Sequence, residues 1–428
     1  MIKKYPIAII GNGGAAITAI KALRQSAFDG PIHLFSDDSD PPYNPMLGTY
    51  FAAGKIPFAN CFPFGASHQI YRDYQVDASM GSPVVDLDAE KQLVKTAKGE
   101  SLVYSQCLIA SGASAVIPPI PGIKGKNVLT LRTAHDAVQL KEALNSRPRK
   151  AVVIGASLVG IKVVELFWQA GMEVCWAEQA ARIFPTLASE EMAAKIQDYL
   201  VAKNIKFRLG ASVQGIEESA GGTMQVYFSD HPAPEEADLV FIGIGARANT
   251  QFLNPQQVNL ERGVLVEDDM KTSMPNLFAA GDVAQGRDPL SGQKKIAALW
   301  SNALYQGRTA GRNMAGGSER YPGSIPHNIT HFMDMTFVSM GDPLNGGDQV
   351  QSWDPDQRTS VRLVIKDHQI VGANLLNIEG AGVLKYHMTK SFAQVLNRLV
   401  PDGGMRLFQL QHPGFLLSDQ FEGGIMNG

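Results

Sequence analysis

The sequence predicts an α/β protein with two three-layer domains of the doubly wound type, followed by a C-terminal α+β domain. Three observations support this fold class. A unit of strand, glycine turn and helix occurs twice, at residues 6–25 and 151–169. Each unit is followed by another short apolar strand, at 32–35 and 173–177, which completes a right-handed βαβ unit. After residue 320 the pattern changes to alternating strands and then a helical stretch.

The later elements follow from the same patterns. Residues 238–245 form an apolar run that ends in glycines, which predicts a buried strand closing the second domain. Alternation of apolar and polar residues predicts strands at 360–365 and 370–375, and helical periodicity follows at 383–399. The glycine-broken, aromatic-rich end at 401–428 is expected to pack on a neighbouring chain.

Length and composition exclude several classes of protein. The chain has 428 residues, of which 45% are hydrophobic, so it is long enough for roughly three globular domains. Its 38 basic and 41 acidic residues give a net charge of -3 without long runs of either sign. Such a balance lacks the phosphate-binding footprint of a nucleic-acid partner.

Cysteine spacing and apolar runs bear on the compartment. The three cysteines, Cys61, Cys107 and Cys175, lie too far apart for a disulfide framework or a paired metal site. His327 and His331 lack a third ligand nearby and are expected to be structural, so no metal site is predicted. The first apolar stretch is too short for a signal peptide, and no run reaches the roughly 20 residues that span a bilayer. We therefore expect a cytoplasmic protein without a membrane span.

The first glycine turn, GNGGAA at residues 11–16, has the residue types that dinucleotide binding requires. Gly11 permits the tight turn, Gly13 lets backbone amides approach a pyrophosphate, and the small Ala16 allows close packing of helix on strand. The helix N-terminus adds a partial positive charge toward the phosphates.

The second turn, GASLVG at residues 155–160, carries serine at the position that corresponds to Gly13. The side chain of Ser157 could crowd a pyrophosphate or donate a hydrogen bond to it, and both outcomes remain open at this point. The turn therefore predicts dinucleotide binding with an altered phosphate contact.

An acidic residue follows the second strand of each βαβ unit. Asp37 lies where a carboxylate can bind ribose hydroxyls, and Asp38 is an equal candidate. Glu178 ends the corresponding strand of the second unit. Because a carboxylate there accepts from a ribose 2′-hydroxyl and repels a 2′-phosphate, it favours NADH over NADPH by at least about tenfold.

Five landmarks in this order resemble the FAD-dependent pyridine nucleotide-disulfide oxidoreductases, in particular the group that holds rubredoxin reductase, the ferredoxin reductases of oxygenase systems and the flavin part of nitrite reductase. They are the turn at Gly11, the segment YNPMLGT at 43–49, LIASGA at 108–113, the turn at Gly155, and NLFAAGDV at 276–283. The resemblance covers about residues 7 to 315. It implies two Rossmann-like nucleotide-binding domains, one for FAD and one for NAD.

The resemblance also implies the cofactor contacts, residue by residue. Asp282 corresponds to the aspartate that binds the flavin ribityl chain, and Trp300 begins the helix that points at the flavin ring. Val84 and Arg132 occupy positions that resemble FAD contacts in the ferredoxin reductases. The implied FAD contacts are Gly11, Gly13, Ala15, Ala16, Asp37, Asn44, Pro45, Thr49, Val84, Ala110, Gly112, Arg132, Gly281, Asp282 and Trp300, and the NAD contacts are Gly155, Ser157, Gly160, Glu178 and Gly245. No catalytic acid or base is implied.

The sequence departs from the resembled families at three points. Residues 43–46 contain no cysteine, and Cys61, the nearest thiol, is expected to be structural, which leaves the flavin as the only electron store. Thr49 stands where the ferredoxin reductases place a lysine, so the partner of flavin N5 is unassigned. Lys162 stands where most relatives have a glutamate, and Glu165 follows one helical turn later.

The predicted organisation follows from these assignments. Residues 1–117 and 247–320 form a discontinuous FAD domain, 118–246 an NAD(H) domain, and 321–428 a C-terminal interface or dimerisation domain. We expect an FAD-dependent NADH:acceptor oxidoreductase that passes electrons to a rubredoxin, a ferredoxin or an iron–sulfur partner. Two alternatives stay open: an electron-transfer or docking subunit with an impaired NAD site, and an NADH oxidase-like enzyme. A homodimer and a hetero-oligomer are both compatible with the sequence.

Overall fold

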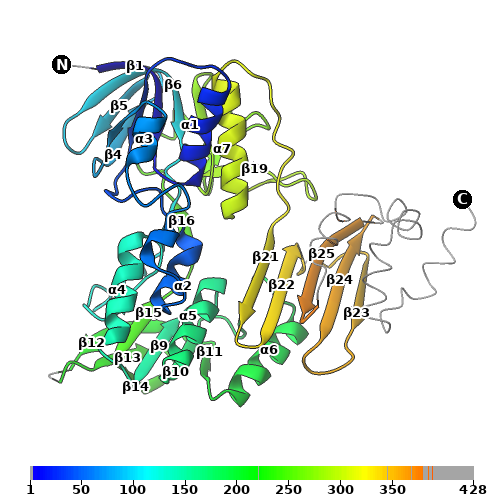
Figure 1. Cartoon of the computed structure of the whole chain (residues 1–428). Helices are drawn as coiled ribbons and strands as arrows, with labels where there is room; N and C mark the ends of the chain where they lie inside the picture. Colours follow the sequence, from blue (N-terminus) through cyan, green and yellow to red (C-terminus); the bar gives the residue numbers. More distant parts are fainter. Residues whose placement is uncertain are drawn as a thin grey trace, which may run out of the picture. The chain divides into compact units, whose positions relative to one another are not determined.

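The computed structural model describes residues 3–219, 221–344, 346–367 and 369–378, together with Leu384 and Met388. The chain divides into two compact units (Figure 1). The first comprises Met1–Gln179 and Ala211–Ser324, and the second comprises Ala180–Gly210 and Ile325–Gly428. Both glycine turns lie in the first unit, so the site is described from that unit alone.

The first sheet of this unit is the larger and has the strand order β3-β2-β1-β6-β5-β4, with β18 also paired to β6. Strands β3, β2, β1, β6 and β18 are parallel, whereas β4 and β5 are antiparallel additions. The bounds are β1 Lys3–Ile10, β2 Ile32–Phe35, β3 Val76–Ser79, β4 Val84–Asp88, β5 Leu93–Thr96, β6 Ser101–Ile109 and β18 Leu277–Ala279. The central strands are buried on both faces, as expected of a parallel sheet covered by helices.

The second sheet of this unit repeats the plan on a smaller scale. Its parallel strands run in the order β10-β9-β15-β8, with β8 Val128–Leu129, β9 Lys150–Ile154, β10 Glu173–Glu178 and β15 Leu239–Ile242. An antiparallel sheet of β12 Val213–Glu218, β13 Met224–Phe228 and β14 His231–Ala237 shares its core. The pair β7 Ala113–Ala115 and β16 Ala246–Ala248 is antiparallel.

Helices and short elements complete the first unit. The helices are α1 Gly14–Gln25, α2 Gly48–Ala52, α3 Gln69–Asp73, α4 Ala134–Asn145, α5 Leu158–Gln169 and α7 Trp300–Met314. Two 3₁₀ helices, η1 Pro45–Leu47 and η2 Phe58–Cys61, lie beside α2 in sequence, and β17 Val264–Leu265, β19 Ala284–Arg287 and β20 Lys294–Lys295 form a small sheet.

The predicted α/β class with two βαβ units is confirmed, and the differences lie at element ends. Helix α1 begins at Gly14 and α5 at Leu158, each three residues earlier than predicted, because Gly13 and Ser157 already have the extended backbone of N-cap residues. The predicted strand at 238–245 is shorter, since β15 ends at Ile242, before Gly243 and Gly245.

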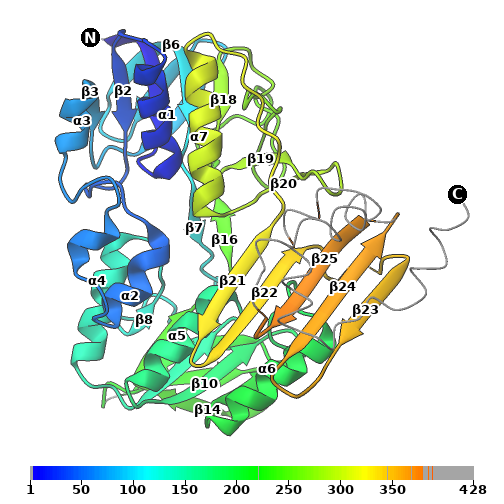
Figure 2. The ribbon, with the colours of Figure 1, turned by 45° about the vertical axis from the view of Figure 1, so that its right-hand side comes forward.

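Two small residues of α1 meet two glycines of α7. A Cβ atom on Gly307 would lie 2.1 Å from the Ala15 carbonyl oxygen, and one on Gly311 would lie 2.3 Å from the Ala19 carbonyl oxygen. The two helices therefore pack backbone to backbone, and they lie side by side in two views (Figures 1 and 2). This contact fixes where α7 begins relative to the first glycine turn.

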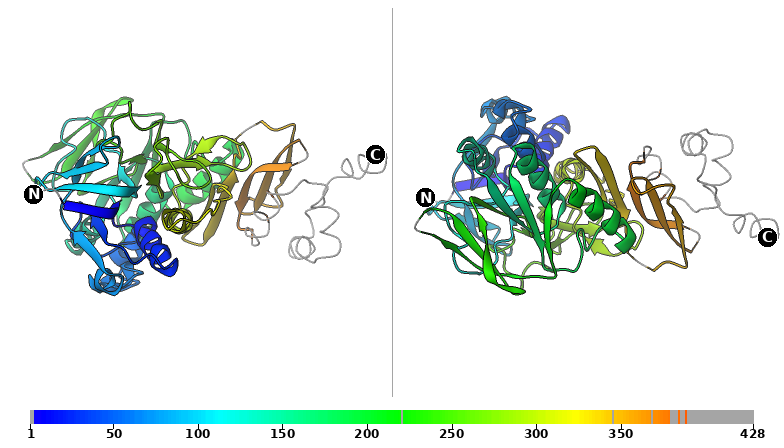
Figure 3. Two further views of the ribbon diagram at one scale, coloured as in Figure 1. Left: turned by 90° about the horizontal axis from the view of Figure 1, so that it is seen from above. Right: turned by 90° about the horizontal axis from the view of Figure 1, so that it is seen from below.

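The second unit is built on an antiparallel sheet in the order β21-β22-β25-β24-β23 (Figures 1 and 3). Its strands are β21 His327–Phe332, β22 Met335–Gly341, β23 Gln349–Trp353, β24 Ser360–Lys366 and β25 Gln369–Leu376, and it also contains α6 Glu190–Ala202 and β11 Lys206–Leu209. The predicted strands at 360–365 and 370–375 are confirmed. The predicted helix at 383–399 lies outside the described residues apart from Leu384 and Met388, which are helical, and the 401–428 stretch lies wholly outside them.

Side-chain hydrogen bonds tie the 180–210 segment to this sheet. The buried Asn374 accepts from the Ser189 amide at 2.9 Å and donates to the Leu187 carbonyl at 2.8 Å. The rings of Phe184 and Phe337 stack with centroids 5.4 Å apart. The predicted NAD(H) domain includes this segment, and the three-domain boundaries stay a prediction.

The contact between α1 and α7 generates a prediction of opposite sign from ordinary helix propensity. A Gly→Ala change inside a helix normally stabilises it by about 1 kcal/mol. We expect Gly311→Ala to lower the free energy of unfolding by about 2 kcal/mol instead, because the added methyl group has no room against α1. Thermal unfolding followed by circular dichroism measures this, with Gly221→Ala, whose nearest neighbour would be 3.8 Å away, as the control. A stabilised Gly311→Ala variant would contradict the packing.

Candidate functional site

The first glycine turn admits no side chain at its first position. Gly11 has φ 112°, and a Cβ atom there would lie 2.1 Å from the Ala110 carbonyl oxygen. The Gly11 amide donates to the Phe35 carbonyl at 2.8 Å, and the Ala110 amide donates to the Ile10 carbonyl at 2.7 Å. These contacts place the turn at the ends of the neighbouring strands β1, β2 and β6.

The third position of the turn faces open space. Gly13 is the N-cap of α1, and no described atom lies within 4 Å of the place where its Cβ would be. Because the amides of the first helical turn lack intrahelical partners, this space lies beside hydrogen-bond donors at the positive end of the helix dipole. Ala15 and Ala16, both buried, complete the tight start of α1.

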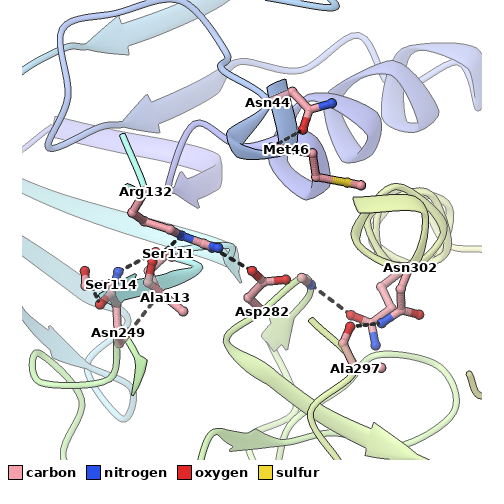
Figure 4. Close-up of polar contacts among 12 residues, drawn as sticks. Asn44, Met46, Ser111, Ala113, Ser114, Arg132, Asn249, Asp282, Ala297 and Asn302 are labelled. Carbon is pink, nitrogen blue, oxygen red and sulfur yellow. Dashed lines mark hydrogen bonds and ion pairs between the residues drawn. The ribbon is translucent and has the colours of Figure 1, made fainter. Parts of the chain in front are cut away.

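An ion pair lies on another side of the candidate site (Figure 4). Arg132 donates through Nη2 to Asp282 at 2.6 Å and through Nε to the Ala113 carbonyl at 2.9 Å. The preceding Gly281 has φ 85°, donates its amide to Gln306 at 2.9 Å, and would carry a Cβ only 3.2 Å from that of Ala15. The first turn, Asp282 and the N-terminal half of α7 are therefore neighbours.

The start of α7 lies against the start of α1. A Cβ atom on Gly14 would meet the Trp300 ring at 3.0 Å and Leu304 at 2.8 Å. No described side chain caps α7, and Asn302 donates to the Ala297 carbonyl at 2.8 Å just before the helix (Figure 4). Two helix N-termini thus carry their partial positive charges into one region.

The 43–49 segment is rigidly built. Asn44 caps η1 by accepting the Met46 amide through its side-chain oxygen at 3.0 Å (Figure 4). The Asn44 backbone amide donates to the Cys61 carbonyl at 2.9 Å. Pro45 follows as the first residue of η1, where its missing N–H is not needed. The Met46 side chain is 64% exposed, so this segment presents apolar surface.

The remaining candidate FAD contacts lie outside the first turn and differ in their surroundings. Val84 is half-buried against the core of the first sheet. Gly112 has φ 65°, and a Cβ there would lie 3.9 Å from the Arg132 guanidinium. Asp37 is exposed, whereas the Asp38 carboxylate accepts the Asp40 amide at 3.0 Å. This hydrogen bond occupies one oxygen of Asp38 and leaves the other able to accept, so Asp37 and Asp38 both stay predicted ribose ligands.

The second turn repeats the backbone contacts of the first. Gly155 has φ 100°, its amide donates to the Ala177 carbonyl at 2.8 Å, and a Cβ there would lie 2.6 Å from the Gly243 carbonyl oxygen. A Cβ on Gly160 would lie 2.4 Å from the Gly155 carbonyl oxygen. Both turns are therefore constrained by the same close approach to the carbonyl of an adjacent strand.

The Ser157 side chain has hydrogen-bond partners within the chain. Its backbone, with φ -100° and ψ 174°, matches that of Gly13, with φ -89° and ψ -171°. Its hydroxyl donates to the Gly243 carbonyl at 2.7 Å and accepts the Gly160 amide at 3.1 Å. Ser157 is therefore the N-cap of α5. Its single hydroxyl proton is directed at Gly243, so we expect it not to donate to a phosphate, and this stays a prediction.

The other candidates of the second turn lie nearby. Glu178 accepts the Ala156 amide at 2.7 Å, which places its carboxylate beside the turn. Gly245 has φ 122°, and no described atom lies within 4 Å of a Cβ there. Ile244, which lies between Gly243 and Gly245, is 40% exposed. The second turn thus has an acidic side and an open, apolar side.

The two other departures seen in the sequence meet in one pocket. Thr49 of α2 and Lys162 of α5 both line it. Lys162 forms an ion pair with the buried Glu165, and its ammonium group lies 5.7 Å from the centre of the Tyr50 ring. Sequence reasoning treated these positions separately, because nothing in their spacing shows that α2 and α5 are neighbours.

None of the three cysteines is an accessible thiol. Cys61, Cys107 and Cys175 are all buried and unbonded to one another. Burial raises the pKa of Cys61 and of Cys107, so less thiolate forms at neutral pH. The described residues contain no group of three or more His, Cys, Asp or Glu side chains placed to hold a metal ion, and within the same part of the chain no helix is both long and apolar enough to cross a membrane.

We call the first glycine turn, the start of α7 and the Arg132–Asp282 ion pair the first cradle, and the second glycine turn with Glu178 and Gly245 the second cradle. The first cradle fits FAD. A side chain at position 13 would fill the space that lies beside the first amides of α1. Asp282 and Arg132 supply a carboxylate and a guanidinium next to this space. These are the donor types that a pyrophosphate and a polyhydroxyl chain require. Two such cradles on one chain define an oxidoreductase that binds two dinucleotides.

The chain belongs to the pyridine nucleotide-disulphide oxidoreductase family, whose model matches residues 5–307. It is 33% identical over 359 residues to the NADH-dependent phenylglyoxylate dehydrogenase subunit epsilon of Aromatoleum evansii, covering 82% of each chain. It is 27% identical to the rubredoxin-NAD(+) reductase of Ectopseudomonas oleovorans, covering 74% of this chain and 81% of that one. The chain is thus an oxidoreductase that uses FAD and NADH.

Solved structures agree on the fold. The ferredoxin reductase of Rhodopseudomonas palustris is 24% identical, with a TM-score of 0.79 over 88% of this chain and 92% of that one. The putidaredoxin reductase in its covalent complex with putidaredoxin gives a TM-score of 0.82 at 21% identity, over 95% of this chain and 99% of that one. The expected family, fold class and cofactors are confirmed, while the individual contact residues stay predictions.

The capping role of Ser157 generates a prediction that separates stability from nucleotide affinity. We expect Ser157→Ala to lower the free energy of unfolding by about 1 kcal/mol, because the first turn of α5 loses its cap. The dissociation constant for NADH should change by less than about threefold, since no phosphate hydrogen bond is lost. Thermal unfolding and NADH titration measure the two effects, and Ser157→Thr, which keeps the capping hydroxyl, should unfold at the same temperature as the unaltered protein. A loss of NADH affinity without a loss of stability would assign the hydroxyl to the phosphate.

Proposed function

We propose that this chain passes electrons from NADH, through bound FAD, to a separate electron-carrier protein such as a rubredoxin, a ferredoxin or an iron–sulfur subunit. The names of relatives support the class of acceptor, since they include a rubredoxin-NAD(+) reductase and a ferredoxin-NAD(+) reductase component. The ferredoxin-NAD(+) reductase component, from Photorhabdus laumondii, is 28% identical over 74% of this chain.

The observation that carries the proposal is the presence of two dinucleotide cradles without an accessible thiol. Because all three cysteines are buried, no thiol pair can take electrons from the flavin and store them. FAD, when bound, accepts a hydride from NADH and releases electrons singly or in pairs. The electrons would therefore leave to an external acceptor, and the carrier proteins named by the relatives support a protein acceptor.

The protein's own residues would bind and orient the two nucleotides. Gly13 and the first amides of α1 would hold the FAD pyrophosphate, and Asp282, oriented by Arg132 at 2.6 Å, would accept from the ribityl hydroxyls. The uncapped N-terminus of α7, which begins at Trp300, would stabilise negative charge on the flavin.

The second cradle would bind NADH. Ser157 closes the first turn of α5, and Glu178, held beside the Ala156 amide, would accept from the ribose 2′-hydroxyl and repel a 2′-phosphate. This supports NADH as the donor in preference to NADPH. The Thr49 and Lys162 pocket between α2 and α5 would lie on the nicotinamide side of the flavin.

Assembly and compartment belong to the same proposal. The Aromatoleum relative is by name one subunit of a dehydrogenase, which supports a hetero-oligomer in which the acceptor is a partner subunit. The three free, buried cysteines are typical of a reducing compartment, so we place the protein in the cytoplasm.

Two other functions, an NADH oxidase and a docking subunit, are also compatible with these observations. Relatives named NADH oxidase, such as that of Methanocaldococcus jannaschii at 25% identity, represent transfer of electrons to oxygen. Ser157 and Lys162 stand where relatives have other residues in the NAD site. They favour the second alternative, a flavoprotein that docks a partner without oxidising NADH.

Anaerobic titration of the yellow holoprotein with NADH tests the proposal. We expect the visible flavin band to bleach with about one equivalent of NADH, because a hydride carries two electrons, and to bleach at least about tenfold more slowly with NADPH. Colour should then return on addition of oxidised rubredoxin or ferredoxin. An unchanged spectrum would support the docking subunit, and rapid return of colour in air alone would support an oxidase.

A further inference from the structure

The first glycine turn is held by a side chain that lies inside it. Asn12, between Gly11 and Gly13, accepts a hydrogen bond from the Tyr71 hydroxyl at 2.6 Å. Its amide nitrogen donates to the Asp40 carbonyl at 3.0 Å. One carboxamide therefore joins the turn to helix α3 and to the loop that follows β2.

Helix α3 holds that loop at a second point. His68 donates through Nε2 to the Ser39 carbonyl at 2.9 Å, and its ring stacks on that of Tyr71 with centroids 5.8 Å apart. The loop carries Asp37 and Asp38, the two ribose candidates. The pyrophosphate side and the ribose side of the first cradle are thus fixed to one helix.

The Tyr71 hydroxyl is a dependable donor. The residue is 5% exposed, and burial raises the pKa of its phenol to about 12. The proton therefore stays on the oxygen throughout the physiological range. If the bond is lost, the buried phenol is left without its partner, which costs more than the loss of an exposed hydrogen bond.

Other side chains hold the second cradle. Ala156 takes the place of Asn12, and its backbone amide donates to Glu178, the residue predicted to contact the nucleotide itself. The Trp176 indole donates to the Gly155 carbonyl at 3.0 Å. The second turn is thus held by side chains of the neighbouring strand β10, whereas Asn12 ties the first turn to helix α3 and to a loop.

We propose that the Asn12–Tyr71 hydrogen bond is a brace that keeps the first turn ordered for FAD and slows the release of FAD from it. A binding site that is already ordered loses less freedom when the ligand binds, and this lowers the rate of release. The inference rests on the proposed FAD role of the first turn. Asn12, Tyr71 and His68 act as positioning residues, since they hold the turn and the loop and touch neither reacting centre.

The test measures FAD release from the holoprotein. Free FAD fluoresces more strongly than bound FAD, so fluorescence after dilution reports the release rate without any turnover. We expect Tyr71→Phe and Asn12→Ala each to release FAD about tenfold faster, because the partly buried hydrogen bond that orders the turn is lost. The dissociation constant for NADH should stay within about twofold of its original value, since the second cradle is unchanged.

Matched controls separate the brace from general loosening. Tyr74→Phe removes a phenol from the residue that follows α3 and keeps its ring near Lys21, so its FAD release should be unchanged. The double variant Asn12→Ala/Tyr71→Phe should release FAD no faster than Asn12→Ala, because Tyr71→Phe removes only the bond that Asn12→Ala has already removed. If Tyr71→Phe does not fold, Asn12→Ala decides the question.

The outcomes are distinct. Release of FAD at the original rate from both single variants would overturn the brace, and so would additive effects in the double variant. Equal acceleration by Tyr74→Phe would do the same, since it would reveal a general loosening of α3. A purified chain that contains no FAD in its unaltered form would contradict the proposed function instead, and would do so before any variant is made.

Discussion

Each glycine turn lies so close to the carbonyl of a neighbouring strand that no side chain fits between them. The Cβ that Gly11 lacks would lie 2.1 Å from the Ala110 oxygen, and that of Gly155 would lie 2.6 Å from the Gly243 oxygen. This approach puts a helix N-terminus directly over the ends of the parallel strands, which is where an open α/β sheet binds its ligand. The remaining features of the site depend on that placement.

The helix pair α1 and α7 extends the constraint from the turn to the rest of the site. Backbone contact at Gly307 and Gly311 brings the start of α7 beside the start of α1, and Gly281 packs on Ala15 in the same region. Asp282 follows directly and is oriented by its ion pair with Arg132. A carboxylate, a guanidinium and two positive helix ends are thus assembled by the close packing of small residues.

Local signals allowed the sequence to predict the frame of the site but not its side-chain connections. The strands and glycine turns were predictable because apolar periodicity and glycine spacing are local properties, and Asp282 because its motif is contiguous. The use of the Ser157 hydroxyl on Gly243 and the link from Asn12 to Tyr71 join residues 86 and 59 positions apart. The meeting of Thr49 with Lys162 likewise depends on how α2 packs on α5, which no local pattern encodes.

The central claim is that the first cradle holds FAD and the second receives NADH. Placing valine at position 13 in one variant and at position 157 in another tests this claim most directly. The extended backbone at Gly13 and Ser157 accepts valine without strain, so each valine fills the cradle. Ser157→Val also removes the cap of α5, and Ser157→Ala is the control for that loss. FAD per chain is then measured by absorbance after denaturing extraction. The account predicts that Gly13→Val purifies without FAD, whereas Ser157→Val keeps about one FAD per chain that NADH no longer reduces. Full FAD content in Gly13→Val, or its loss in Ser157→Val, would contradict the account.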